Sequence, residues 1–413
     1  MAEPTFDTQL AGLARRQSDE HSGLLTPAFV ALLIAQGSFG YAFSSFLLLP
    51  KFLDSQLGVG PFEIGLLAAV YGAVVVLCVP AMGVLVDRHG RRDFLTAGGL
   101  LMAASSLAYV SVVEVGPLLY GLRAIQAIAF AMAFAAGAAL AVDLAPPGRL
   151  SHAIGVFGLT FLSMNAVAPA MVEEISARAG WPVAFAVAAV GALLCAILSR
   201  RIPDLRPDHA TTGEIPSLWS VAKRPRLLRL MLIIAPVGTA MATLFIFFQP
   251  YARELGIQNL KSFFVAYALC AVFVRGALGS FAERVGLHRV SIGGLALYVA
   301  VVTAAVALQP GWLPVFGAGL GIAHGFAYPS LNAIAVEGVA QNERGKVMAL
   351  FQAAFNVGFA GFSILLGLLA QEQGYRPVFG VGGLCALAAL AILVNSPEGR
   401  GAGAGRPDQH EAE

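Results

Sequence analysis

The chain is built from long apolar stretches that are separated by short polar segments. Twelve such stretches, numbered here as spans 1 to 12, lie at residues 27–50, 62–86, 93–113, 117–142, 151–173, 181–199, 227–250, 262–283, 289–309, 312–336, 346–370 and 376–395. An α-helix rises about 1.5 Å per residue, so roughly 20 apolar residues cross a hydrocarbon core of about 30 Å. Each stretch therefore predicts a transmembrane helix.

The composition agrees with a membrane protein. Of 413 residues, 58% are hydrophobic and only 12% are charged, about half the charged share of soluble domains. We therefore predict an all-α membrane protein of twelve transmembrane helices whose main partner is the lipid bilayer. The net charge of +2 is spread along the chain, and without a concentrated basic face no nucleic-acid partner is expected.

The positions of Lys and Arg predict the orientation. If both termini are cytoplasmic, the inner loops and tails hold nineteen of the 26 Lys and Arg residues, the outer loops hold five, and Arg123 and Arg275 lie inside spans. Cytoplasmic loops of membrane proteins are enriched in Lys and Arg. Both termini are therefore predicted to be cytoplasmic.

A long polar linker divides the spans six and six. We predict five regions: a cytoplasmic N-terminal tail at 1–26, a six-helix bundle at 27–199, a cytoplasmic linker at 200–226, a second six-helix bundle at 227–395, and a disordered tail at 396–413. Similar residues recur between the bundles, for example Phe157 with Phe351 at an offset of 194. This repeat predicts two pseudo-symmetric halves with the same orientation in the membrane.

A charged loop motif follows span 2 and recurs after span 8. The segment GVLVDRHGRR starts at Gly83, and GSFAERVG starts at Gly279. Glycine allows close helix approach and a positive-φ turn, while Asp87 is suited to accept hydrogen bonds from a helix N-terminus and to pair with an arginine. We interpret the motif as a conformational latch, against the alternative of a solvated loop. Its members are Gly83, Asp87, Arg88, Gly90, Arg91, Gly279, Glu283, Arg284 and Gly286.

Three titratable side chains fall inside spans. Arg123 lies roughly 9 Å below the outer end of span 4. Its side chain either reaches up to the membrane interface or has a functional role inside the membrane. Arg275 lies deep in span 8, where a buried guanidinium is costly and points to function or to a structural pair with a helix terminus. His324 lies at the middle of span 10 and is either a hydrogen-bonded core residue or a group for substrate or protons. Glu114, Glu173 and Glu174 lie near outer ends and are predicted to be solvated.

The motif GVLVDRHGRR resembles the loop motif of the major facilitator superfamily, and RAIQAIAFA from Arg123 resembles its span 4 motif, with Ala127 in place of a glycine. The resemblance implies that the latch holds the outward-facing state, that Arg123 takes part in proton coupling, and that spans 1, 4, 7 and 10 line a central cavity. The residues expected along a substrate or proton pathway are Arg123, Arg275, His324, Gln36, Tyr41, Thr239, Thr243, Asn332 and Asn356, with Ser44, Gln249, Gln352 and Asn165 as further candidates.

The sequence contains no nucleotide-binding loop, metal-ligand spacing or nucleophile beside a base. We therefore expect no enzyme activity, metal or cofactor. We expect the energy to come from an ion gradient, namely one of protons. The alanine- and glycine-rich composition indicates the bacterial inner membrane, and a monomer suffices for this fold. The chain resembles a family branch of bacterial sugar or drug effluxers, which implies export of a small amphipathic or drug-like metabolite, and the repeat predicts alternating access of the two halves. Ala168-Pro169 departs from the antiporter motif of span 5. Import of a small polar or anionic solute, and a non-transporting sensor, are the alternatives.

Overall fold

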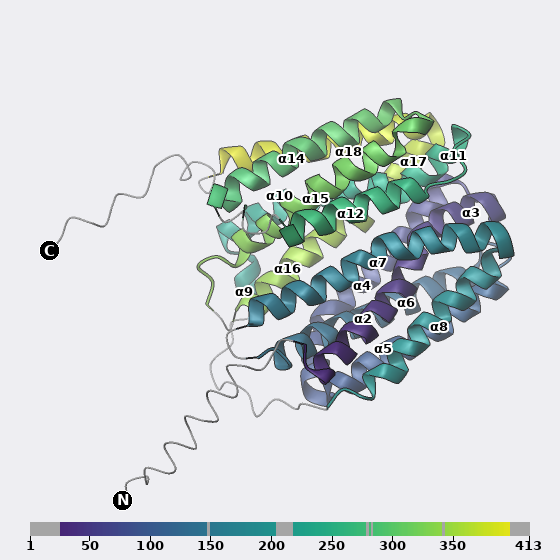
Figure 1. Cartoon of the computed structure of the whole chain (residues 1–413). Helices are drawn as coiled ribbons and strands as arrows, with labels where there is room; N and C mark the ends of the chain where they lie inside the picture. The colour runs from purple at the N-terminus through teal and green to yellow at the C-terminus, as the bar shows by residue number, and fades with distance from the viewer. Residues whose placement is uncertain are drawn as a thin grey trace, which may run out of the picture.

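The computed structural model is helical throughout the residues that it describes, which are 25–146, 149–203, 218–277, 281, 284–340 and 343–396 (Figure 1). The first half contains α2 (Pro27–Ser45), η1 (Phe46–Leu48), α3 (Leu49–Leu57), α4 (Pro61–His89), α5 (Arg91–Ala108), η2 (Tyr109–Ser111), α6 (Pro117–Asp143), α7 (Leu150–Ala179) and α8 (Trp181–Ser199). A short helix, α9 (Leu218–Ala222), precedes the second half. The second half contains α10 (Pro225–Ala242), η3 (Thr243–Phe247), α11 (Phe248–Glu254), α12 (Lys261–Ala277), α14 (Leu287–Ala304), η4 (Ala305–Ala307), η5 (Pro310–Trp312), α15 (Leu313–Val336), α16 (Arg344–Asn356), η6 (Val357–Gly361), α17 (Ser363–Gln373) and α18 (Tyr375–Asn395).

The predicted spans fall on helices where the structure describes them, and the all-α membrane fold is confirmed, while the count of twelve transmembrane helices stays a prediction. Among the described residues, ten helical segments are long and apolar enough to cross a membrane. Helices α12 and α15 pack against each other and against these segments. Span 5 is longer than predicted, because α7 continues to Ala179 and ends only at Gly180, whose φ of 87° favours glycine.

The two groups of helices lie side by side, and two seams join them (Figure 1). At one seam α7 packs against α12, and at the other α4 packs against α16, η6 and α17. At the second seam Ser363 Oγ donates a hydrogen bond of 2.9 Å to Gly65 O. A Cβ built on Gly65 would lie 2.2 Å from the Ser363 carbonyl oxygen. Small residues therefore let the two halves meet backbone to backbone.

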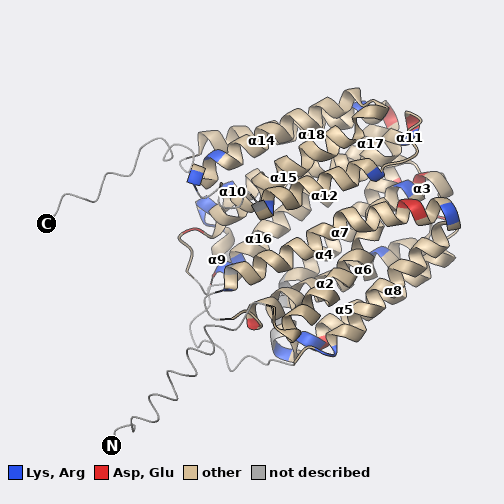
Figure 2. Ribbon diagram, viewed as in Figure 1, with Lys and Arg blue, Asp and Glu red and all other residues tan. Residues whose placement is uncertain are grey.

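The two ends of the bundle differ in charge, and Figure 2 shows Lys and Arg gathered mainly at one of them. We call this the basic end. It includes Arg88, Arg91, Arg92, Arg149, Arg200, Arg224, Arg226 and Arg344, which lie at the helix ends that α4, α5, α7, α8, α10 and α16 share there. The opposite end, called the far end, carries mixed charges that include Lys51, Asp54, Glu173, Arg253 and Lys261.

The two copies of the loop motif contain the glycine turn that the sequence predicts. Gly90 alone separates α4 from α5, with φ of 106°, and Gly286 precedes α14 with φ of 98°. A side chain at either position would be strained, because L-residues avoid this region. The duplicated motif therefore turns the chain sharply in both halves.

Candidate functional site

A cavity of about 110 Å³ lies between the two halves, toward the far end. Its walls come from α2, η1, α3, α4 and α6 of the first half and from η3 and η6 of the second. The lining residues are Phe43, Phe46, Leu47, Leu49, Pro50, Leu53, Ile64, Leu67, Ala68, Tyr71, Arg123, Phe245, Ile246 and Phe359. The wall is apolar apart from the Tyr71 hydroxyl and the Arg123 guanidinium, so the cavity suits an amphipathic molecule.

The second half contributes to this cavity through two irregular turns. Residues 243–247 and 357–361 form π-helical turns, and they place Phe245, Ile246 and Phe359 in the cavity wall. Such turns insert an extra residue into a helix and are frequent at functional sites. Sequence patterns did not reveal them, because a one-residue insertion hardly changes an apolar run.

Arg123 lies in α6 and forms the first of two arginine–tyrosine sites, which we call the Arg123 site. Its guanidinium carbon lies 4.5 Å from the ring centroid of Tyr71, and its Nη1 donates a 3.0 Å hydrogen bond to Gln126 Oε1. The Nε atom is buried and has no hydrogen-bond partner among the described residues. A cation over an aromatic face is stabilised without losing its charge. Arg123 therefore lies at the cavity with its charge only partly satisfied.

Arg275 lies in α12 and forms the Arg275 site. It lies close enough to Tyr267, Tyr328 and His324 to interact electrostatically with all three. His324 is 7% exposed, and its Nδ1 lies 3.3 Å from the hydroxyl of Tyr298. Arg275 Nε is buried without a hydrogen-bond partner in the described part of the chain. His324 is thus a hydrogen-bonded histidine that lies beside a membrane-embedded cation.

The two sites use equivalent positions of the repeat. Tyr71 in α4 and Tyr267 in α12 are 196 residues apart, which is the offset between the two copies of the loop motif. Each tyrosine lies beside an arginine, but Arg123 comes from α6 whereas Arg275 comes from the same helix as its tyrosine. The halves therefore hold related but unequal sites.

Neither arginine has a carboxylate partner among the described residues. The ion pairs between described residues do not include Arg123 or Arg275. Among the described residues, no Asp or Glu acts electrostatically on Tyr71, Tyr267 or Tyr328. A buried guanidinium without a counter-ion is costly in hydrocarbon. Guanidinium forks bind carboxylates and other oxyanions with two parallel hydrogen bonds. The arrangement is therefore suited to an anionic ligand.

The other predicted pathway residues lie outside the cavity wall. Thr239 Oγ1 donates to Gly358 O at 3.0 Å, and Thr243 Oγ1 donates to Ala240 O at 2.7 Å. Gln36 is fully buried inside the first half, and Asn356 Nδ2 donates to Gln352 O. Tyr41 and Asn332 are partly buried. Of the nine residues predicted for this pathway, Arg123 lines the cavity.

A polar chain of further candidates crosses the seam between the halves at mid-membrane. Ser44 Oγ donates a 2.8 Å hydrogen bond to Asn165 Oδ1, and Asn165 in turn hydrogen-bonds Tyr267. Tyr328 donates to Gln352 Oε1 on the next helix. This chain connects α2 and α7 of the first half with the Arg275 site of the second.

The latch residues are only partly described. Gly279 and Glu283 lie outside the described residues, as do the side chains of Gly83 and Asp87 within α4. Arg88 and Arg284 are exposed. Arg91 forms an ion pair with Asp143 and donates to Ala139 O, so it binds α6 of its own half. The latch therefore stays a prediction.

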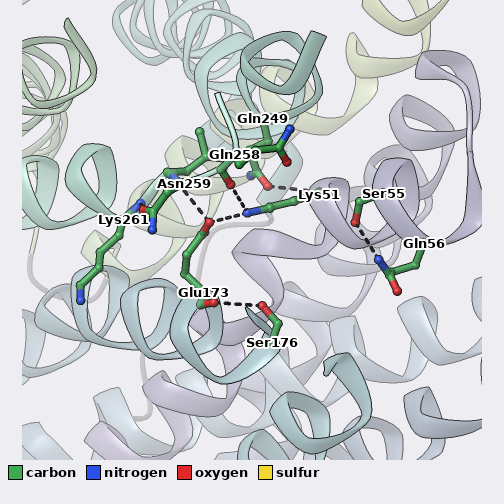
Figure 3. Close-up of polar contacts among 10 residues, drawn as sticks. Lys51, Ser55, Gln56, Glu173, Ser176, Gln249, Gln258, Asn259 and Lys261 are labelled. Atoms are coloured by element: carbon green, nitrogen blue, oxygen red, sulfur yellow. Dashed lines mark hydrogen bonds and ion pairs between the residues drawn. The ribbon is translucent and has the colours of Figure 1, made fainter. Parts of the chain in front are cut away.

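Polar contacts join the halves at the far end, and Figure 3 shows their centre. Glu173 of α7 forms an ion pair with Lys51 of α3 and accepts a 3.3 Å hydrogen bond from Leu260 N of the second half. Beside it, Arg253 Nη1 lies 2.6 Å from Asp54 Oδ2.

The prediction that Glu173 is solvated was wrong, because the carboxylate is only 4% exposed, whereas Glu174, at 43%, and Glu114 are exposed as predicted. The longer α7 carries Glu173 into the seam. Lys51 was missed because it looks like an ordinary loop cation.

The chain matches the Major Facilitator Superfamily over residues 30–276 and 259–412. Among solved structures it is similar to the peptide transporter POT, with a TM-score of 0.75, 15% identity and coverage of 90% of this chain and 95% of that chain. It is similar to the nucleoside transporter NupG, with a TM-score of 0.71, 14% identity and coverage of 88% of this chain and 99% of that chain. It is also similar to the human organic anion transporter MFSD10 (TETRAN), with a TM-score of 0.66, 16% identity and coverage of 89% of this chain and 100% of that chain. At such low identity these structures establish the shared fold.

Proposed function

The chain belongs to the major facilitator superfamily, and from this premise we propose that it is a secondary transporter of a small amphipathic organic anion. The observation that carries the proposal is the pair of membrane-embedded arginines, Arg123 and Arg275, without a carboxylate partner among the described residues. Two such positive charges attract an anionic solute and repel a cationic one. Of the alternatives that the sequence left open, this favours an anionic solute.

The cavity supports the amphipathic part of the proposal. Its volume of about 110 Å³ is similar to the roughly 150 Å³ of an apolar cavity that binds benzene. Aromatic and aliphatic side chains of both halves surround the body of the solute, and Arg123 binds its acidic group. Phe245, Ile246 and Phe359 approach from the second half, so ligand binding and the relative position of the halves are coupled.

The two arginines lie at different depths, which supports a stepwise path. Arg123 is six residues into α6 from the far end, and Arg275 is fourteen residues into α12, so the difference in depth is roughly 12 Å at 1.5 Å per residue. In our proposal the anion binds first beside Arg123 and moves toward Arg275 as the halves rock about the seam. The excess of Lys and Arg at the basic end supports placing that end in the cytoplasm.

Ligand-dependent thermal unfolding of the purified protein tests the proposal. Benzoate, benzenesulfonate and succinate are compared with neutral benzamide and cationic benzylamine. We expect an aromatic anion to raise the melting temperature, because a ligand at 100 times its Kd stabilises the native state by about 2.7 kcal/mol. Benzamide and benzylamine should have no effect at equal concentration.

Two arginine variants test whether the aromatic anion binds at Arg123 and Arg275. Arg123→Gln and Arg275→Gln should each weaken the stabilisation by the anion at least tenfold in apparent Kd, because each removes a charge that the anion requires. Arg178→Gln, at an 80% exposed arginine of the far end, is the matched control and should bind as the wild type does. Stabilisation by benzamide equal to that by benzoate would contradict an anion site, and binding without flux would favour a sensor.

A further inference from the structure

Glu173 is a buried carboxylate whose two oxygens have different surroundings (Figure 3). Its Oε1 forms the ion pair with Lys51 and accepts the backbone hydrogen bond from Leu260. Its Oε2 is fully buried and has no hydrogen-bond partner among the described residues. A buried carboxylate oxygen without a donor carries a substantial desolvation penalty. One oxygen is thus bound, and the other is free to take a proton.

Lys51 ties this carboxylate to the second half. Its Nζ also donates a 2.5 Å hydrogen bond to Gln258 O, and its backbone N donates to Gln249 Oε1 at 3.3 Å. The Gln249 amide then donates to Leu47 O at 2.6 Å. We call the group formed by Lys51, Glu173, Gln249, Gln258 and Leu260 the far-end gate. Three of its members belong to the second half, so the gate holds the halves together.

Several charged groups around the gate have partners of their own, and Glu254 lines a pocket together with Asp54, Arg253 and Gln258. On α7, Glu174 pairs with Arg178 and lies 4.0 Å from Lys261 at the start of α12. Between α3 and α11, Asp54 pairs with Arg253. Lys51 is the cation that faces Glu173 in the described part of the chain. The charge of Glu173 is therefore balanced by Lys51.

We propose that Glu173 is the group that binds the coupling proton, and that its protonation opens the far-end gate. This inference rests on the proposed transport function. A proton from the far-end water binds Oε2 and makes the side chain neutral. Lys51, whose side chain is 16% exposed, then lacks its counter-ion in a partly buried seam, which is unfavourable, so the ammonium moves to water and gives up its hydrogen bond to Gln258. When the gate closes, Glu173 gives its proton to the pathway on the inner side of the gate, and the ion pair with Lys51 forms again.

The proposal fixes the direction of the pH dependence. The closed gate requires the ionised carboxylate, so low pH favours the open far end and high pH favours the closed one. For a single proton, the ratio of open to closed molecules changes by at most about tenfold per pH unit.

The test is a distance measurement across the gate in the full-length protein without added ligand. The four cysteines, Cys78, Cys195, Cys270 and Cys385, are replaced by alanine, and spin labels are attached through Ala177→Cys on α7 and Gln371→Cys on α17. Both positions are exposed and lie at the far end in different halves. Double electron–electron resonance then gives the open fraction between about pH 8 and about pH 4, a range that reaches below the ordinary glutamate value of about 4.3.

We expect the open fraction of the labelled parent to rise as the pH falls. Glu173→Gln should be open at every pH, because a neutral amide replaces the carboxylate. Lys51→Gln should shift the midpoint to higher pH, because the buried carboxylate then lacks its cation. Glu174→Gln, the matched control one residue away, should keep the midpoint of the parent.

A pH response that persists in Glu173→Gln would overturn the proposal, and so would an unchanged midpoint in Lys51→Gln. If size-exclusion chromatography shows that Glu173→Gln does not fold, the midpoint of the pH response of Lys51→Gln still tests the proposal. If the gate hypothesis is wrong, the spin labels show no response that depends on Glu173, and benzenesulfonate still binds. Failure of the transport function removes binding and flux but leaves the response of the spin labels, so the two failures are distinguishable.

Discussion

At the residue scale, the sequence identifies unusual charges but not their surroundings. Arg123, Arg275 and His324 stand out because titratable groups are rare within apolar spans, and the structure places each beside at least one tyrosine. Lys51 and Glu173 do not stand out, because acids and bases at helix ends are common. Their burial depends on how α3, α7 and the loop before α12 meet in space. Pairings between distant segments are what a single sequence does not contain.

The basic end offers a residue-scale prediction about pH. Arg224 donates to both oxygens of Glu343, at 2.6 and 2.8 Å. These hydrogen bonds hold the pKa of Glu343 below its ordinary value and raise the pKa of Arg224. Because the folded-state pKa of the carboxyl is depressed, its contribution to stability is present above the unfolded-state pKa and is lost as the pH falls through the folded-state pKa.

Glu343→Gln should therefore lower the melting temperature at neutral pH. The difference from wild type should shrink as the pH falls below about 4.3, the ordinary value for glutamate. Thermal unfolding of the purified proteins at several pH values measures this. Glu337→Gln, at a 68% exposed residue 3.3 Å from Arg226, is the control and should have the smaller effect. A difference between Glu343→Gln and wild type that does not depend on pH would refute the role of the charge.

At the element scale, helix positions could be predicted well and helix contacts could not. Span 6 at 181–199 agrees with α8, and span 12 at 376–395 with α18 to within one residue. Apolar length and flanking charges determine such boundaries. The end of α7 was misplaced, because the charged pair formed by Glu174 and Arg178 looks like a loop although it continues the helix. The π-helical turns and the close glycine contacts leave no periodic signal.

The glycine contacts predict different effects within a half and between the halves. A Cβ on Gly321 of α15 would lie 2.2 Å from Tyr267 O in the same half, so Gly321→Ala should destabilise the fold by about 1–3 kcal/mol. A Cβ on Gly65 would meet Ser363 O of the other half at the same distance. Because the halves can separate there, Gly65→Ala should raise the open fraction of the far end and spare the melting temperature.

Gly121→Ala serves as the control for both variants. A Cβ on Gly121 of α6 meets nothing within 4 Å, so this substitution should be neutral or stabilising by up to about 1 kcal/mol. Thermal unfolding and the spin-label distance at the far end provide the two measurements. If Gly65→Ala lowered the melting temperature as much as Gly321→Ala and left the distance unchanged, the seam would be a fixed part of the fold.

At the scale of the whole molecule, the repeat predicted two halves of like orientation, and the packing of α7 on α12 and of α4 on α17 shows how they meet. The internal offset of 196 residues also relates Tyr71 to Tyr267. The sequence does not say which end of the pathway is closed. The gate around Glu173, the ion pair of Asp54 with Arg253 and the contact of Gly65 with Ser363 join the two halves at the far end in this structure. The cavity beside Arg123 lies directly behind these contacts.

The central claim is that the protein carries an organic anion through a path that requires its two membrane-embedded arginines. The most direct test is uptake of radiolabelled benzenesulfonate into proteoliposomes, because this anion stays ionised and crosses lipid slowly. We predict faster uptake by the wild type than by protein-free liposomes, with Arg275→Gln and Arg123→Gln at the protein-free rate and Arg178→Gln at the wild-type rate. Wild-type uptake at the protein-free rate, or full uptake by both arginine variants, would contradict the account.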